Sequence, residues 1–289
     1  MPEMSSDNEQ LGLTARWTAL GRAEESQRED ALFHDPWAAS LAGELGQGWE
    51  DLELPEEIQK ALRATLSVRT RFFDDFLQRA AIEQKIRQVV LIAAGLDARA
   101  FRLPWPEQTR LFELDQPHVL EYKEQVLAAG NAKAACERRI IKVDLRDAWG
   151  EALKDAGFDA EQPSVWLMEG LQPYLSSEAL ERLFDEITSL SAPQSQLSFD
   201  AAGGAWLTSE LVRPMIELMA RSGIFWLSSM DDPQAFLEER GWSATVIQMG
   251  EKDANYGRWH YPVIPLSVPD VPRNWLVVAQ KNQMQAGRN

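Results

Sequence analysis

Gln88-Val89-Val90-Leu91-Ile92-Ala93-Ala94-Gly95-Leu96-Asp97 is the stretch that decides the fold class of this chain. Its apolar first half predicts a buried strand, and the small residues that follow predict a tight turn. Leu111-Phe112-Glu113-Leu114-Asp115 predicts the next strand, and it ends in an acid at about the 20-residue spacing typical of nucleotide-binding sheets. The pair of stretches therefore indicates a site for an adenosine-containing cofactor.

Two later strand-like stretches also end in acids. Ile140 to Val143 leads into Asp144, and Ser164 to Met168 leads into Glu169. Because the carboxyl ends of strands in an open parallel sheet line one crevice, these two acids and Asp115 are predicted to converge on one ligand. The alternative is that each acid caps the helix that follows it.

The chain of 289 residues is expected to form a single α/β domain around a doubly wound, mostly parallel sheet with an antiparallel edge strand. Strand and helix patterns alternate through its central part. The expected segments are a mobile tail (1–10), an N-terminal helical region (11–80), the core sheet (86–199), a helical insertion that covers the site (200–240) and C-terminal strands (241–280).

Local signals mark three helix starts. Ser176 is predicted to cap a helix, and Asp232 with Pro233 is predicted to open another. Near the N-terminus, Pro36 is predicted to occupy the first position of a helix, where its missing N–H is harmless.

A set of short stretches, spread over most of the chain, carries a family resemblance. They are Ser67 to Phe76, Ala94 to Leu103, Glu113 to Pro117, Val143 to Arg146, Met168 to Leu175, Tyr261 to Pro265 and Val271 to Val277. They resemble the leucine carboxyl methyltransferase superfamily, and the last two resemble its bacterial polyketide-type O-methyltransferases most. The resemblance implies a Rossmann-like fold and S-adenosylmethionine (SAM) as cofactor, with S-adenosylhomocysteine as product.

The resemblance and the chemistry of SAM together imply binding roles for the acids. Asp115 is expected to accept hydrogen bonds from both ribose hydroxyls, with Glu113 as the alternative. Asp144 is expected to accept from the adenine amine, while Leu145 contacts the ring. Glu169 is expected near the ammonium group or the sulfonium.

The remaining cofactor contacts are expected from arginines and from the turn. Arg69 matches the family's arginine for the cofactor carboxylate, which a guanidinium grips with two parallel bonds, and Arg22 is expected to be a second basic contact. Gly95 is expected to let backbone approach the cofactor. Ala93 stands where the family usually has glycine. Arg99 and Arg102 are expected to pair with acids inside the fold.

The expected reaction transfers a methyl group from the sulfonium to an oxygen of a small molecule. A carboxylate acceptor requires mainly alignment and exclusion of water, whereas a hydroxyl or phenol requires a base, for which Tyr174 and His260 are the candidates. Tyr256, Arg258 and Trp259 are predicted to form a substrate wall, because aromatic rings offer flat apolar contact and arginine binds anions.

Composition narrows the partners. The 45 acidic and 29 basic residues give a formal charge of −16, which disfavours nucleic acid and anionic membranes. With one cysteine and three histidines, no internal disulfide and no metal site are expected. The N-terminus is unlike a secretory signal and no apolar run approaches membrane-spanning length, so a cytoplasmic monomer or homodimer is expected.

Two other functions are compatible with a sheet of this kind. A nicotinamide-dependent oxidoreductase is disfavoured by the poor glycine pattern and by the lack of a Tyr-x-x-x-Lys pair. A non-catalytic SAM-binding protein is disfavoured by the intact cofactor residues, although the alanine at Ala93 keeps it in consideration.

Overall fold

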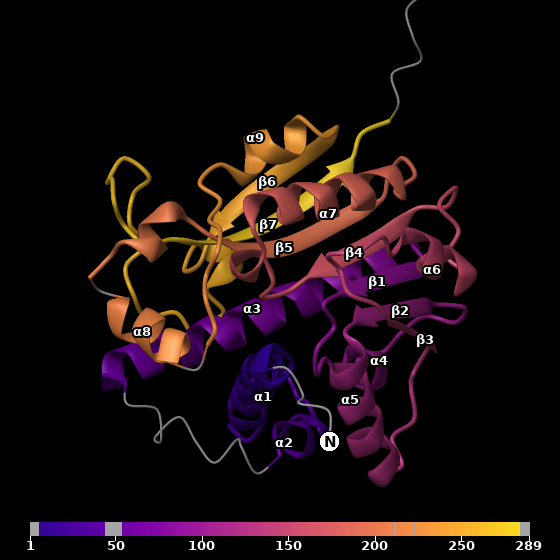
Figure 1. Cartoon of the computed structure of the whole chain (residues 1–289), viewed down its shortest axis with the longest axis horizontal. Helices are drawn as coiled ribbons and strands as arrows, with labels where there is room; N and C mark the ends of the chain where they lie inside the picture. The colour runs from indigo at the N-terminus through magenta and orange to yellow at the C-terminus, as the bar shows by residue number, and fades with distance from the viewer. Residues whose placement is uncertain (1–5, 44–53, 211, 222, 284–289) are drawn as a thin grey trace, which may run out of the picture.

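The centre of the protein is a seven-stranded sheet with the strand order β3-β2-β1-β4-β5-β7-β6 (Figure 1). The computed structural model describes residues 6–43, 54–210, 212–221 and 223–283. Strand β7 runs antiparallel to both neighbours, and the other strand pairs are parallel. The strands are β1 (Gln88–Ile92), β2 (Arg110–Asp115), β3 (Glu137–Lys142), β4 (Ser164–Met168), β5 (Gln196–Ala202), β6 (Trp242–Gln248) and β7 (Asn274–Lys281). The predicted fold class is confirmed.

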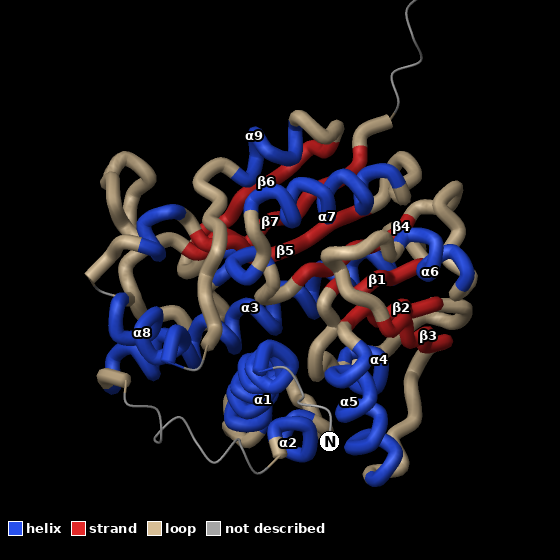
Figure 2. The backbone as a smooth tube through the Cα atoms, viewed as in Figure 1, coloured by secondary structure: helices blue, strands red, loops and turns tan. Residues whose placement is uncertain are grey.

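Helices lie on both sides of the sheet (Figure 2). The α-helices are α1 (Ser6–Ser26), α2 (Ala38–Ala42), α3 (Glu56–Ile82), α4 (Arg99–Arg102), α5 (Pro117–Ala129), α6 (Gly150–Asp155), α7 (Ser177–Ser189), α8 (Arg213–Arg221) and α9 (Pro233–Glu238). Short 3-10 helices are η3 (Gln172–Tyr174), η4 (Gly204–Leu207) and η5 (Lys252–Ala254). None of the described helices has the length and apolar character needed to cross a membrane.

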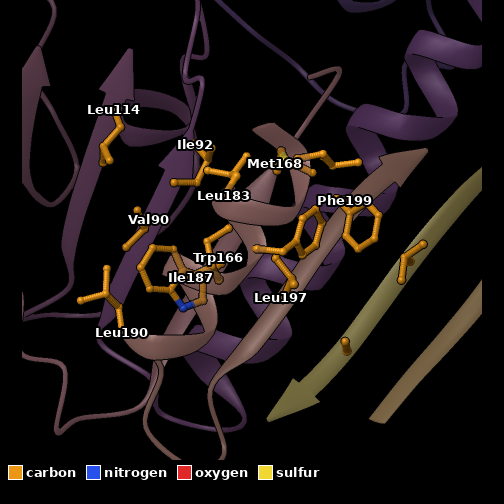
Figure 3. Close-up of a cluster of buried hydrophobic side chains, with 14 of the residues drawn as sticks. Val90, Ile92, Leu114, Trp166, Met168, Leu183, Ile187, Leu190, Leu197 and Phe199 are labelled. Carbon is orange, nitrogen blue, oxygen red and sulfur yellow. The ribbon is translucent and has the colours of Figure 1, made fainter. Parts of the chain in front are cut away.

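The alternation of side chains along β1 explains the two layers of helices. Val90 and Ile92 face a core built with α7 (Figure 3), and Val89 and Leu91 face the core built with α3. Successive side chains of a strand point to opposite faces, so an all-apolar strand predicts burial on both. All five residues of β1 are buried. The run that predicted the fold is thus the strand that both helix layers cover.

The predicted caps of α7 and α9 are confirmed. The Ser176 side chain accepts from Ala179 N, and the Asp232 side chain accepts from Ala235 N. The prediction for Pro36 is wrong, because α2 begins at Ala38 with Trp37 as its N-cap. There the Asp35 carboxylate accepts from Trp37 N at 3.1 Å, so a turn precedes the helix.

The N-terminal helix is longer than predicted. Residues 6–10, assigned to a tail from the sequence, belong to α1, while residues 1–5 lie outside the described residues. The helical region expected over 11–80 divides into α1, α2 and α3, with residues 44–53 also outside the described part. The chain thus places α1 and α2 beside the loop after β1, where both share an apolar cluster with Leu96.

Candidate cofactor and acceptor site

A cavity of about 750 Å³ lies at the carboxyl ends of the parallel strands. Its wall includes every residue that the sequence analysis proposed for the cofactor. These are Arg22, Arg69, Ala93, Gly95, Asp115, Asp144, Leu145 and Glu169. They come together because the ends of parallel strands lie along one edge of the sheet, with α1 and α3 beside it. The volume is in the range of small-molecule and cofactor sites.

The turn after β1 is held by the acid at the end of β2. Asp115 accepts hydrogen bonds from Gly95 N at 2.6 Å and from Gln116 N at 2.7 Å. Burial raises the pKa of its carboxyl group, although the two backbone N–H groups oppose the shift. Glu113 is fully buried elsewhere, paired with Lys123 and Arg138. Of the two candidate acids, Asp115 is therefore the one in the cavity wall.

The backbone at Ala93 explains why glycine suits this position. Its φ angle is +52°, in the left-handed region where a Cβ atom is unfavourable. Replacing Ala93 with glycine is expected to raise the free energy of unfolding by up to about 1 kcal/mol, since relief of this strain exceeds the added entropy of the unfolded chain. Urea denaturation measures the change.

Ala94→Gly is the matched control for Ala93→Gly. Ala94 is buried and is not among the residues with positive φ, so the control is expected to lower stability by about 1 kcal/mol. Equal effects of the two substitutions would contradict the argument from backbone strain.

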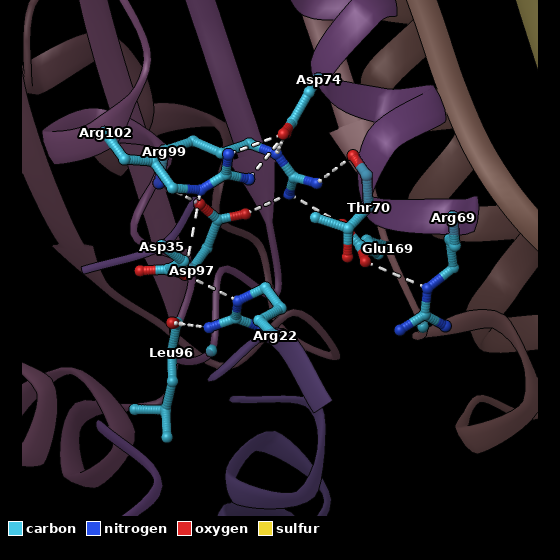
Figure 4. Close-up of polar contacts among 12 residues, drawn as sticks. Arg22, Asp35, Arg69, Thr70, Asp74, Leu96, Asp97, Arg99, Arg102 and Glu169 are labelled. Atoms are coloured by element: carbon cyan, nitrogen blue, oxygen red, sulfur yellow. Dashed lines mark hydrogen bonds and ion pairs between the residues drawn. The ribbon is translucent and has the colours of Figure 1, made fainter. Parts of the chain in front are cut away.

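A network of arginines and acids connects residues of the cavity wall to the interior of the protein (Figure 4). Glu169 accepts from Arg69 Nε at 3.0 Å and from Arg99 Nη1 at 2.7 Å. Arg99 also donates to Asp74, at 2.6 Å. Burial raises the pKa of Glu169, but the charges of the two arginines outweigh burial and lower it. Arg102 also pairs with Asp74, so the expectation that Arg99 and Arg102 pair with internal acids is confirmed.

Asp200, two residues before the end of β5, is a site residue that the sequence analysis missed. Its carboxylate accepts from Arg69 Nη1 at 2.9 Å and from Gly170 N at 2.6 Å. The signal was present, because Phe199-Asp200 repeats the apolar strand ending in an acid seen three times before it. Arg69 is thus held between two carboxylates, and its Nη2 has no hydrogen bond to a described residue.

Arg22 and Asp144 also have protein partners. Arg22 donates to the buried Asp35 at 2.9 Å and to Leu96 O at 2.7 Å, which ties α1 to the loop after β1. Asp144 accepts from Arg146, and this hydrogen bond lowers the pKa of its carboxyl group. Both side chains line the cavity from these fixed positions.

The leucine carboxyl methyltransferase family model matches residues 15–188, which is more than half of the chain. This chain belongs to that family. A relative from Parafrankia sp., named as an S-adenosyl-L-methionine-dependent methyltransferase, is 44% identical over 246 residues, which cover 82% of this chain and 78% of the relative. A second relative with the same name, from Mycobacterium avium, is 38% identical, and the match covers 94% of this chain and 95% of the relative. The protein is therefore a SAM-dependent methyltransferase.

Solved structures agree with this methyltransferase in fold. A DUF574 family protein from Streptomyces avermitilis superposes with a TM-score of 0.55 at 16% identity. The match covers 91% of this chain and 96% of the Streptomyces protein. A protein from Thermobifida fusca titled as a methyltransferase has a TM-score of 0.54 at 14% identity, with coverages of 91% and 94%. At these identities the likeness concerns the fold alone.

The cavity of this methyltransferase fits the chemical groups of SAM. Asp115 offers carboxylate oxygens to hydroxyl donors, and Arg69 keeps one donor nitrogen for a carboxylate. Glu169 and Asp200 place carboxylates in the wall, which suits an ammonium or sulfonium cation.

The predicted substrate wall is only partly in the cavity of this methyltransferase. Trp259 lines it, as does Tyr174, but Tyr256, Arg258 and His260 do not. The structure therefore places these three residues outside the cavity lining.

Contacts to distant elements draw these side chains away from the cavity. Tyr256 donates its hydroxyl to Asp75 at 3.1 Å, and Arg258 pairs with Glu25 at 2.8 Å and with Asp30 at 2.9 Å. His260 is exposed. Ion pairing therefore ties Arg258 to α1.

The network predicts how the stability of this methyltransferase depends on pH. Burial alone would raise the pKa of Asp97, but Arg99 and other cations lower it from 3.8 to about 2. A folded-state pKa below the unfolded value stabilises the protein above about pH 4, and this stabilisation is lost as the pH falls toward about 2. The expected loss is about 2 kcal/mol.

Urea denaturation at a series of pH values tests this dependence. The free energy of unfolding of Asp97→Asn is expected to change less over this window than that of the natural chain or of Asp147→Asn, an exposed control. Identical slopes for all three proteins would contradict the role of Asp97.

Proposed function

We propose that this methyltransferase transfers the methyl group of SAM to a carboxylate oxygen of a small-molecule acid. The supporting observation is the state of two titratable groups in the wall, Tyr174 and Glu169. Burial raises the pKa of Tyr174 to about 12, and two arginines hold Glu169 as a carboxylate of lowered pKa. Neither group is suited to take a proton near neutral pH. An acceptor that is already an anion needs no such group.

The proposed cofactor roles follow the positions in the wall. Asp115 binds the ribose hydroxyls, Asp144 and Leu145 face the adenine, and Arg69 binds the cofactor carboxylate through Nη2. Arg22 orients α1 over the turn at Gly95. When bound, SAM supplies an electrophilic methyl group on a cationic sulfur.

The wall then aligns and desolvates the reactants. Glu169 and Asp200 lie beside Arg69 and provide negative charge for the cationic part of the cofactor. Tyr174 is a half-buried wall residue that orients the acceptor as a neutral phenol. Alignment and exclusion of water are the main contributions required for a carboxylate acceptor. We further propose that the chain acts as one domain, with residues 200–240 as its cover.

The pH dependence of methyl transfer tests the proposal. With a carboxylic acid as acceptor, kcat is expected to stay flat from about pH 6 to 9, because the acceptor is ionised throughout. Tyr174→Phe is expected to keep kcat within about threefold, since no proton passes to the phenol oxygen.

Phenols and alcohols serve as the comparison acceptors. Transfer to a phenol but to no carboxylic acid, with kcat rising with pH and abolished in Tyr174→Phe, would reject the carboxylate proposal. Binding of S-adenosylhomocysteine, measured by isothermal titration, checks that each variant retains its cofactor site.

A further inference from the structure

The cavity extends past the proposed cofactor residues toward β5 and the insertion that follows it. Apart from Arg22 on α1 and Arg69 on α3, the cofactor candidates lie at or after the ends of β1, β2, β3 and β4. Next to β4 in the sheet is β5, and the cavity wall continues over Asp200, Ala201 and Ala202 at its end. The space for the acceptor therefore lies between this end of β5 and the insertion.

The side of this space that faces the insertion is apolar. Residues at the start of the α3 region pack against the insertion in one apolar cluster. Several members of this cluster also line the cavity, among them Leu54, Leu62, Trp206, Met215, Met219 and Trp226. The rings of Trp206 and Trp226 lie 5.4 Å apart between centroids. Methionine side chains adapt to differently shaped apolar ligands. This cluster, called the acceptor wall below, combines two rigid indoles with two adaptable side chains.

Most of the cations that line the cavity are paired with carboxylates. Among the described wall residues they are four arginines: Arg22, Arg69, Arg146 and Arg273. The first three are paired with carboxylates. Arg273 donates from Nη2 to the backbone oxygens of Pro265 at 2.8 Å and Val268 at 2.7 Å. A second anionic group on the acceptor would therefore lose hydration and find one cation without a described carboxylate partner, Arg273, whose guanidinium already donates to backbone oxygens.

We propose that the acceptor is a monocarboxylic acid with an uncharged apolar body, an alkyl chain or an aromatic ring, that packs against the acceptor wall. This inference rests on the proposed carboxylate methylation and specifies its substrate class. The carboxylate lies toward Tyr174 and the end of β4, and the apolar body lies among Met215, Met219 and the two indoles.

Binding of a chain-length series to the unaltered protein tests the inference. Butanoate, hexanoate and octanoate are titrated into the protein saturated with S-adenosylhomocysteine. Affinity is expected to rise by about fourfold for each added methylene until the wall is filled. Octanedioate, which adds a second carboxylate to the same chain, is expected to bind at least tenfold more weakly than octanoate. Equal affinity across the series would overturn the inference.

A pair of variants locates the apolar contact. Met219→Gln puts an amide into the acceptor wall and is expected to reduce the gain per methylene while leaving affinity for S-adenosylhomocysteine unchanged. Leu227→Gln is the matched control, because Leu227 lies in the same insertion but is 58% exposed and does not line the cavity. Equal loss of octanoate affinity in both variants would place the acceptor elsewhere.

Turnover of the same acids separates this inference from the proposed function. If octanoate binds selectively and is also methylated, the result supports both carboxylate methylation and the apolar substrate class. Selective binding without methylation of any acid supports the apolar acceptor wall and overturns carboxylate methylation. Methylation of all the acids at equal kcat/KM supports carboxylate methylation and overturns the apolar substrate class.

Discussion

Replacing Asp115 with alanine is expected to weaken binding of S-adenosylhomocysteine by about 100-fold, the effect of losing two charge-assisted hydrogen bonds. The same carboxylate holds the turn, by accepting from Gly95 N and Gln116 N, and is our candidate for the ribose hydroxyls. Its loss therefore removes a ligand contact and also releases the backbone that shapes the cavity. Isothermal titration of the folded variant measures the effect.

Two further variants separate the contributions of Asp115. Asp115→Asn keeps one acceptor oxygen and is expected to show an intermediate loss. Asp147→Ala removes an exposed acid in the loop after β3, outside the cavity, and is expected to bind as the natural chain does. An Asp115→Ala protein that is folded and binds within threefold of the natural chain would reject the ribose assignment.

Arg69→Met is expected to lower the free energy of unfolding by about 3 kcal/mol, because removing one partner of a buried ion pair leaves charge uncompensated. Arg69 is 9% exposed and is the only arginine paired with Asp200 among the described residues. We also expect binding of S-adenosylhomocysteine to weaken more than tenfold, since Arg69 is our candidate for the cofactor carboxylate. Urea denaturation and titration measure the two effects separately.

Arg69→Met combined with Asp200→Asn distinguishes structure from binding. The second substitution removes the uncompensated carboxylate, so part of the lost stability is expected to return. The binding defect is expected to remain, because no cation replaces the guanidinium. If cofactor affinity returned together with stability, Arg69 would be a structural residue and the carboxylate assignment would fail.

The proposed cofactor residues were predictable because their positions depend on local pattern and on one rule of topology. The small-residue turn follows directly from β1, and the acids follow β2, β3 and β4. Strand ends in a parallel sheet share an edge, so the sequence alone brings them into one crevice. Asp200 obeys the same rule and was missed only because the pattern was not followed through β5.

Long-range pairing decides where the side chains predicted for the acceptor side lie. Arg258 follows aromatic and glycine residues that favour a substrate loop, yet it pairs with Glu25 on α1, which lies 233 positions earlier in the chain. With 45 acids in the sequence, local pattern does not select one partner. The strain at Ala93 is likewise a property of the folded turn, since its φ of +52° follows from the backbone path between β1 and α4.

By itself the sequence determined the alternating α/β order, the strand that both helix layers cover, and the edge where the cofactor candidates meet. These follow from hydrophobic periodicity and chain direction, which are local properties. Only the tertiary structure decided which arginines remain available to a ligand and which side chains line the proposed acceptor space. Those outcomes depend on long-range contacts that α1, α3 and the insertion after β5 make. The energies of such contacts cannot be inferred from local sequence.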